Sequence, residues 1–260
     1  MFGKGLIRKE VFNVASFKKL CRNASFDLEL EALSPIHIGT ESSNENKNLM
    51  MKNDYNEDVK YVITGSSVKG VVRSYLSDLA VYFDTQQFNE LLEDLFGTQS
   101  LKGRIFISDS EFDKEVQGSK TINAIPRLSA RDPKIIEYEV IRPTTKWVLH
   151  LDVMNPTAED FGLMALVLKA LYSGSVQIGH GKSRGFGRVA LHRADVVLEF
   201  FGGKAGQEIA KKSIHVDLSD WKKEKSLISE RYLKSFEKEQ TFRWMQFGVD
   251  ALAEKVAGGV

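Results

Sequence analysis

The sequence has a single cysteine, Cys21, and only five prolines among its 260 residues. One cysteine cannot form an intramolecular disulfide, and this favours a reducing compartment such as the cytoplasm. The five histidines are scattered along the chain, so together with one cysteine they show none of the spacings of a zinc site. Disulfide-rich secreted scaffolds and zinc-finger modules are therefore excluded as classes.

Long apolar segments are also missing. No run of about 18 apolar residues is present, so the sequence predicts no membrane-spanning helix and no membrane partner. Residues 1–10 lack the apolar core of a secretory signal, and we expect none. Hydrophobic residues make up 42% of the chain, which is typical of a soluble globular protein with one large domain or two small ones.

An excess of charge of one sign is the third feature that the sequence lacks. Lysine and arginine total 36, aspartate and glutamate total 35, and the formal net charge is +1. A protein that binds nucleic acid by bulk electrostatics alone would carry a larger positive charge. A nucleic-acid-binding function would therefore depend on where the cations lie.

The hydrophobic pattern predicts a mixed α+β chain. Residues 24–38 alternate between apolar and polar, as in a half-buried strand, and the polar residues 40–60 predict a long loop. Further predicted strands are 61–63, 104–109, 139–141, 147–153, 189–191 and 196–201, and predicted helices are 68–83 (capped by Ser66 or Ser67), 89–96 and 161–172 (capped near Thr157). Two split βαβ halves of this kind predict a ferredoxin-like sheet with loop insertions.

Two segments extend this core. Residues 113–138 carry mixed charge with Gly118, Pro126 and Pro133, and we expect an extended hairpin or loop there. The composition shifts to lysine and glutamate after residue 202, and we expect a largely helical tail over 213–260. The predicted organisation is a domain at 1–202 followed by a C-terminal extension at 203–260.

The strongest chemical motif is the glycine-rich stretch 179–188. Its four glycines allow positive φ angles and close approach of a ligand, and consecutive exposed amides bind anions. Lysine and arginine within it add positive charge, so the candidate phosphate-binding residues are Gly181, Lys182, Ser183, Arg184 and Arg188. The alternative is an ordinary turn with solvated cations; the stretch matches neither a dinucleotide fingerprint nor a P-loop.

A second candidate lies at residues 65–73. Ser66 and Ser67 come at the start of a predicted helix, where free amides and hydroxyls attract phosphate. Lys69 and Arg73 are one turn apart and predict contacts with two adjacent phosphates. A capped helix with surface cations would look the same.

His37 and the loop that follows it could carry acid–base chemistry. A histidine titrates near neutral pH and can act as a base beside RNA, although a packed or hydrogen-bonded strand-end residue is the alternative. Carboxylates in the loop could hold a divalent metal or accept the proton of a 2′-OH, or they could simply be solvated. These acids are Glu41, Glu45, Asp54, Glu57 and Asp58.

These motifs, in this order, resemble the RAMP superfamily, and specifically the repeated backbone subunit of type III CRISPR effector complexes. The matching segments are His37-Ile38-Gly39, 62–73, 95–97, 103–109 and 181–188. The resemblance implies an RNA-recognition-motif-like core with a β-hairpin thumb, here at 113–138. It implies guide CRISPR RNA, target RNA and other effector subunits as partners, including copies or paralogues of this chain. His37 and the two basic motifs would then bind the guide.

The resemblance also raises the question of cleavage. Family members cut target RNA with an aspartate in the loop between the histidine and glycine-serine motifs. Counted back from Gly65 without gaps, that position is Leu49, and Asp54 is the nearest aspartate. We therefore name Asp54 as the candidate catalytic acid, acting with Mg²⁺ or another divalent metal. A binding subunit without chemistry, and a relative that processes guide RNA with His37, stay open as alternatives.

Overall fold

The computed structural model describes residues 20–40, 47–55, 58–82, 85–124, 134–202 and 207–216, together with Asp250 and Leu252. For a few strand residues, Asp54 among them, it describes the backbone alone. None of the helices in these ranges is long and apolar enough to cross a membrane.

A five-stranded sheet forms the centre of the molecule, with the strand order β11-β10-β1-β9-β5 and only antiparallel neighbours. Its strands are β1 (Arg22–Ala32), β5 (Ile105–Ile107), β9 (Lys146–Met154), β10 (Val189–Gly202) and β11 (Gln207–Val216). The α-helices of the described ranges are α1 (Gly65–Leu79), α2 (Thr85–Phe96) and α3 (Ala158–Ser173). The predicted α+β class is confirmed.

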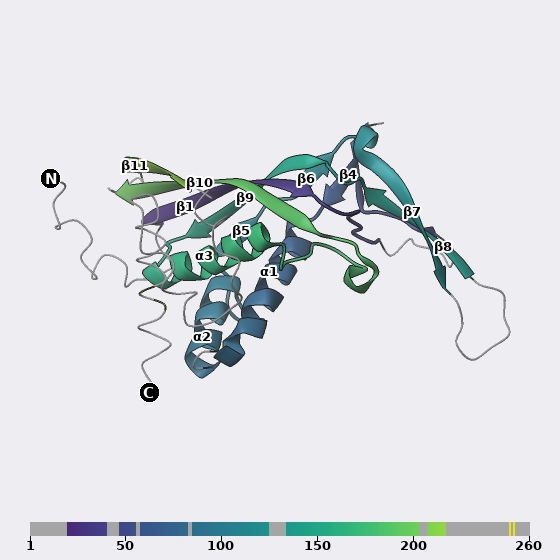
Figure 1. The fold of residues 1–260 in the computed structure, drawn as a ribbon. Coiled ribbons are helices and arrows are strands. Elements are labelled where there is room, and N and C mark those ends of the chain that lie inside the picture. The colour runs from purple at the N-terminus through teal and green to yellow at the C-terminus, as the bar shows by residue number, and fades with distance from the viewer. Residues whose placement is uncertain are drawn as a thin grey trace.

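The helices lie on one side of this sheet (Figure 1). The alternation in β1 explains why: Phe26, Leu28 and Leu30 are buried beneath the helices, while Asp27 lies exposed on the opposite face. Side chains alternate between the faces of a strand, so one face of β1 supplies the core and the other faces solvent.

The helix ends follow local capping rules, with one correction. Helix α1 is capped by Thr64, whose side chain accepts a hydrogen bond from the Ser67 amide, and not by Ser66 or Ser67 as predicted. Helix α3 is capped by Thr157 as expected, in a capping box with Asp160. Gly174, with φ of 70°, ends α3 in the left-handed conformation that favours glycine.

Two predicted segments differ from the structure. The expected loop 40–60 contains β2 (Lys47–Asn48), β3 (Lys52–Tyr55) and the first half of β4 (Asp58–Ile63), because β3 pairs with β4, which also pairs with β6 (Ser110–Phe112). These strands are polar and short, so the sequence shows no alternation. The tail that was expected to be helical contributes β11, which pairs along β10. Residues 203–206, 217–249, 251 and 253–260 of that tail lie outside the described ranges.

The expected hairpin is present in the described part of 113–138. After a short 3-10 turn, β7 (Gln117–Ala124) pairs with β8 (Lys134–Ile141) in antiparallel register, from Gln117 opposite Ile141 to Ala124 opposite Lys134. Residues 125–133 lie outside the described ranges. Figure 1 shows the two strands reaching away from the central sheet.

Arg104 joins the helices to the sheet. It is 2% exposed and lies directly before β5. Its guanidinium donates to the carboxylate of Asp160 at 2.6 and 3.0 Å, to that of Asp94 on α2, and to the carbonyl oxygen of Asn155 at 3.3 Å. Burial opposes the charge, but the two carboxylates outweigh it and raise the pKa of Arg104. One side chain thus connects α2, the N-terminus of α3 and the end of β9.

Replacing Arg104 with alanine is expected to lower the free energy of unfolding by about 3–5 kcal/mol, because Asp160 would be left buried without its cation. Arg193→Ala is the matched control. Its guanidinium pairs with Asp195 at 2.7 Å but is largely exposed, so a loss of only about 0–1 kcal/mol is expected. Urea denaturation of both variants measures the difference, and equal losses would contradict the role assigned to Arg104.

Candidate nucleic-acid interface

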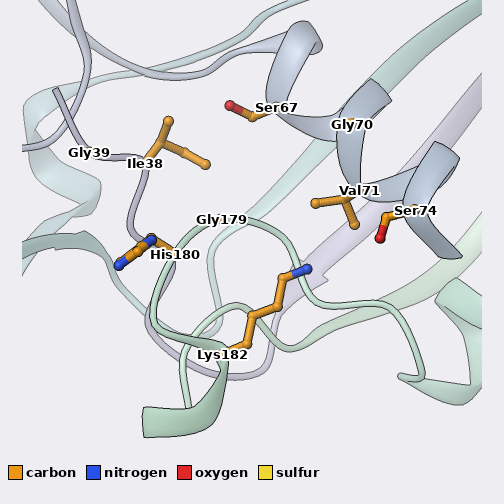
Figure 2. A pocket seen from close by; sticks show the side chains of 9 residues that line it. All are labelled: Ile38, Gly39, Ser67, Gly70, Val71, Ser74, Gly179, His180 and Lys182. Carbon is orange, nitrogen blue, oxygen red and sulfur yellow. The ribbon is translucent and has the colours of Figure 1, made fainter. Parts of the chain in front are cut away.

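Three segments that are distant in the sequence meet around one pocket of about 360 Å³. They are the segment after β1 that contains Ile38 and Gly39, helix α1, and the glycine-rich loop that follows α3. The residues lining the pocket are Ile38, Gly39, Ser67, Gly70, Val71, Ser74, Gly179, His180 and Lys182 (Figure 2). Hydroxyls, apolar surface, a histidine and a lysine ammonium therefore face the same space.

Helix α1 presents one of its faces to this pocket. Ser67, Gly70, Val71 and Ser74 follow the i, i+3, i+4, i+7 spacing of a single helical stripe. A Cβ atom added at Gly70 would meet nothing within 4 Å, so the packing of this chain does not require glycine there. Glycine in a helix costs about 1 kcal/mol relative to alanine. The bare backbone at Gly70 leaves room for close approach from the pocket side.

The glycine-rich loop is shaped by positive φ angles, as the sequence predicts. Gly179, Gly181, Gly185 and Gly187 have φ between 79° and 89°. Two of them also lie against other backbone: a Cβ at Gly179 would be 2.3 Å from the carbonyl oxygen of His37, and one at Gly187 would be 2.2 Å from that of Ile178. The loop therefore needs glycine for its conformation and for its fit to the chain beneath it.

Hydrogen bonds attach the ends of this loop to the segment after β1. The amide of His180 donates to the carbonyl oxygen of His37, and the amide of Gly187 donates to that of Pro35, both at 2.8 Å. Lys182 follows in a short 3-10 turn, and its side chain points toward α1 (Figure 2). His180 is exposed and lines the pocket, although the sequence analysis did not single it out. The sequence feature that could have identified His180 is its place in the glycine-rich stretch, two residues before Lys182.

His37 has a structural position. Its ring is 2% exposed, bonds through Nδ1 to the carbonyl oxygen of Glu139 at 2.7 Å, and meets the Tyr138 ring edge-on at 5.2 Å. Burial lowers the pKa of His37, so the ring is neutral near pH 7 and Nδ1 is the donor. Its carbonyl group holds the glycine-rich loop, and its ring lies beside the hairpin. The geometry favours the packed alternative over acid–base chemistry.

Lys69 and Arg73 are not among the residues that line the pocket. The Lys69 ammonium donates to the carbonyl oxygen of Ile105 at 3.0 Å, and a guanidinium nitrogen of Arg73 donates to that of Gly97 at 3.1 Å. Burial, with a smaller contribution from the charge of Arg73, lowers the pKa of Lys69. Lys69 therefore extends toward β5 and Arg73 toward the end of α2. At about 100° per residue, the two cations lie roughly 160° and 120° around the helix from Ser67.

The remaining predicted residues are not among those that line the pocket. Ser66 is exposed, and its hydroxyl bonds to that of Thr64 at 3.3 Å. Ser183 and Arg188 are exposed, and the Arg188 amide bonds to the Ser34 hydroxyl at 2.9 Å. The Arg184 guanidinium donates to the Tyr138 hydroxyl at 2.5 Å. Of the cations predicted to bind phosphate, the structure brings Lys182 to the pocket.

Leu49, at the position where the resemblance predicts a catalytic acid, lies close to the pocket rim. The Leu49 carbonyl oxygen accepts from the amide of Thr40, the residue after Gly39, at 3.3 Å. Asp54 lies on β3 opposite Val59, and its carboxylate lies outside the described part of the structure. Five residues of extended chain separate Asp54 from Leu49, which is up to roughly 16 Å. Cleavage by Asp54 stays a prediction.

A divalent metal finds no ready site among the described side chains. No carboxylate is among the residues that line the pocket. Nor do the described ranges contain a group of three or more histidine, cysteine, aspartate or glutamate side chains that could hold a metal ion. Glu41, Glu45 and Glu57 lie outside those ranges. The acids named as candidate metal ligands lie outside the described side chains, so the divalent metal stays a prediction.

The family model of the RAMP superfamily matches residues 29–190, which is well over half of the chain and spans the pocket and the hairpin. The protein therefore belongs to the RAMP superfamily.

Among solved structures, it is similar to a chain in the cryo-EM structure of the type III-B Cmr-beta complex bound to cognate target RNA. The TM-score is 0.53 at 15% sequence identity, and the match covers 67% of this chain and 61% of that chain. At this identity the likeness shows the fold. No curated protein matches the sequence significantly.

Gly179→Ala is expected to destabilise the protein more than Gly185→Ala. Both positions have positive φ, so alanine costs about 1–2 kcal/mol in backbone strain at either. Only Gly179 would also place its methyl group 2.3 Å from a carbonyl oxygen, while Gly185 has nothing within 4 Å. Urea denaturation should therefore give a clearly lower midpoint for Gly179→Ala. Equal midpoints would contradict the close approach.

Proposed function

We propose that this chain binds guide RNA as a backbone subunit of a type III CRISPR ribonucleoprotein in antiviral defence. In this role it would display the guide for pairing with target RNA. The observation that carries the proposal is the pocket between α1 and the glycine-rich loop, which Lys182, Ser67 and Ser74 line together.

The chemistry of the pocket suits one nucleotide unit of an RNA backbone. A lysine ammonium neutralises a phosphate, and serine hydroxyls and exposed histidine nitrogens donate to phosphate or ribose oxygens. Ile38 and Val71 supply apolar surface for the sugar or base. Nothing in this arrangement reads base edges, so binding independent of sequence is expected, as a subunit that carries variable guides requires.

The fold supports the same proposal. The order β10-β1-β9-β5, with helices between β1 and β5 and between β9 and β10, is that of a ferredoxin-like core built from two split βαβ halves. The β7–β8 hairpin would be the thumb that enters the guide–target duplex. We assign the RNA-binding domain to residues 1–202 and an extension to 203–260, with β11 continuing the sheet of the first.

The near-neutral charge indicates how such a subunit works. A net charge of +1 and one lysine at the pocket give few phosphate contacts per chain. Copies or paralogues arranged along one guide would add their contacts, because each further contact becomes intramolecular. The proposed partners are therefore guide RNA, target RNA and other effector subunits, in the cytoplasm.

Replacing Lys182 with alanine is expected to weaken RNA binding equally for all sequences. Losing one phosphate contact on a single strand should also reduce the slope of log affinity against log salt by about 0.7. Binding of a fluorescent oligouridylate across a salt titration measures both effects.

Lys102→Ala removes the same charge at an exposed site that does not line the pocket, where the ammonium lies over the Phe106 ring at 5.4 Å. This control should keep the wild-type slope. A Lys182→Ala variant that behaves like the control would show that RNA does not occupy the pocket.

RNA is expected to drive assembly. Size-exclusion chromatography with light scattering should show small species without RNA and larger particles when a long single-stranded RNA is added, because avidity accumulates along the strand. A chain that stays monomeric with RNA and its partner subunits present would count against a backbone role.

A further inference from the structure

We infer that Tyr138, on strand β8 of the hairpin, is a positioning residue for the RNA pocket. It holds Arg184 and thereby fixes the tip of the glycine-rich loop, where Lys182 lies. Arg184 then acts on RNA through the shape of the loop, and Lys182 acts by contact. This inference rests on the proposed function and names a contact between hairpin and loop on which that function depends.

The two parts of the loop are held by different elements. Its ends are bonded to residues 35–37 through the amides of His180 and Gly187. The tip at 182–185 is contacted by the hairpin instead: the Arg184 guanidinium donates to the Tyr138 hydroxyl at 2.5 Å, and the Lys120 ammonium of β7 reaches the Arg184 carbonyl oxygen at 3.5 Å. The side of the loop that faces the pocket is thus oriented from the hairpin.

A small buried cluster supports this contact. Phe186, 1% exposed, packs against the Tyr138 ring at 5.4 Å and lies beneath the Lys120 ammonium at 4.5 Å. A Cβ at Gly181 would be 3.0 Å from the Phe186 ring, so the start of the 3-10 turn lies directly on this cluster. Tyr138, Val140 and Phe186 form a hydrophobic core separate from the main one.

Lys182 and Arg184, which look equivalent in the sequence, therefore have different roles. Lys182 lines the pocket, whereas Arg184 does not and has its guanidinium directed to a tyrosine hydroxyl. Because Tyr138 belongs to the hairpin, the direction of the hairpin and the position of Lys182 are also linked. If RNA moves the loop, β8 of the hairpin is therefore expected to move with it.

Tyr138→Phe tests this directly, since it removes the hydroxyl and leaves charge and ring unchanged. With the oligouridylate probe, affinity is expected to fall roughly threefold to tenfold, as for loss of the net contribution of one typical hydrogen bond. The salt slope should stay that of the wild type, because no phosphate contact is lost. Arg184→Gln should weaken binding similarly, and the double variant should bind no worse than the weaker single variant.

Amide hydrogen exchange of the full chain without RNA provides a readout independent of binding. Tyr138→Phe should speed exchange of the Gly185 and Phe186 amides, which bond to the carbonyl oxygens of Lys182 and Gly181. Tyr82→Phe, at a residue 66% exposed between α1 and α2, is the matched control and should change nothing.

The outcomes separate the two proposals. If exchange is unchanged in Tyr138→Phe, Tyr138 does not hold the tip of the loop. If exchange is faster but RNA affinity is unchanged, Tyr138 holds the loop but does not position it for RNA. An Arg184→Gln variant whose slope falls by about 0.7, beside a silent Tyr138→Phe, would make Arg184 a direct phosphate ligand. If the wild-type chain binds no RNA at low salt, the proposed function fails, while the exchange data still decide whether Tyr138 braces the loop.

Discussion

The pocket, the glycine-rich loop and the root of the hairpin depend on one close approach of two backbone segments. Gly179 passes so near the carbonyl oxygen of His37 that a Cβ would be 2.3 Å away, and the adjacent amide of His180 bonds to the same oxygen at 2.8 Å. This crossing brings the end of the first strand segment and the loop after α3 together, although more than 130 residues separate them in the sequence. Once they are joined, α1 closes the third side.

The pocket and the open face of the sheet differ in charge, because no carboxylate lines the pocket whereas several lie on the open face. Sheets of the RNA-recognition-motif type bind RNA through aromatic rings on the open face. Here the central strands β1 and β9 place Asp27, Glu29 and Asp152 outward, and the exposed His150 pairs with Asp27 at 2.6 Å. Arg193 of β10, which lies opposite Glu29 and pairs with Asp195 at 2.7 Å, belongs to the same face, so this face carries both signs of charge. An overall charge of +1 therefore coexists with a local cationic site.

The hydrophobic pattern of the sequence predicted the strands and helices that bury one face. It missed the strands that form because of pairing with segments distant in the sequence. The sequence predicted the buried face of β1 from the alternation of Phe26, Leu28 and Leu30. It also predicted the positive φ angles of the loop glycines, because both features depend on local geometry alone. Strands β3 and β11 were missed, since their pairing partners, and not their own alternation, make them strands. Lys69 and Arg73 resemble a phosphate clamp in sequence, but which carbonyl groups lie nearby is known only after folding.

Strand β8 contacts two segments beside the pocket: the glycine-rich loop and the chain around Leu49. Successive residues of a strand point to opposite sides. Tyr138 reaches the glycine-rich loop through Arg184, while the buried carboxylate of Glu139 accepts from the Met50 amide at 3.1 Å and pairs with Lys52 at 3.0 Å. Burial lowers the pKa of Lys52, but the hydrogen bond and charge of Glu139 outweigh it and raise this pKa, so Lys52 stays charged at neutral pH. These contacts hold the segment that contains Leu49, the position predicted for a catalytic acid, beside the pocket rim. Strand β8 thus contacts both the segment that contains Leu49 and the loop proposed to hold RNA, so that displacement of β8 would disturb both together.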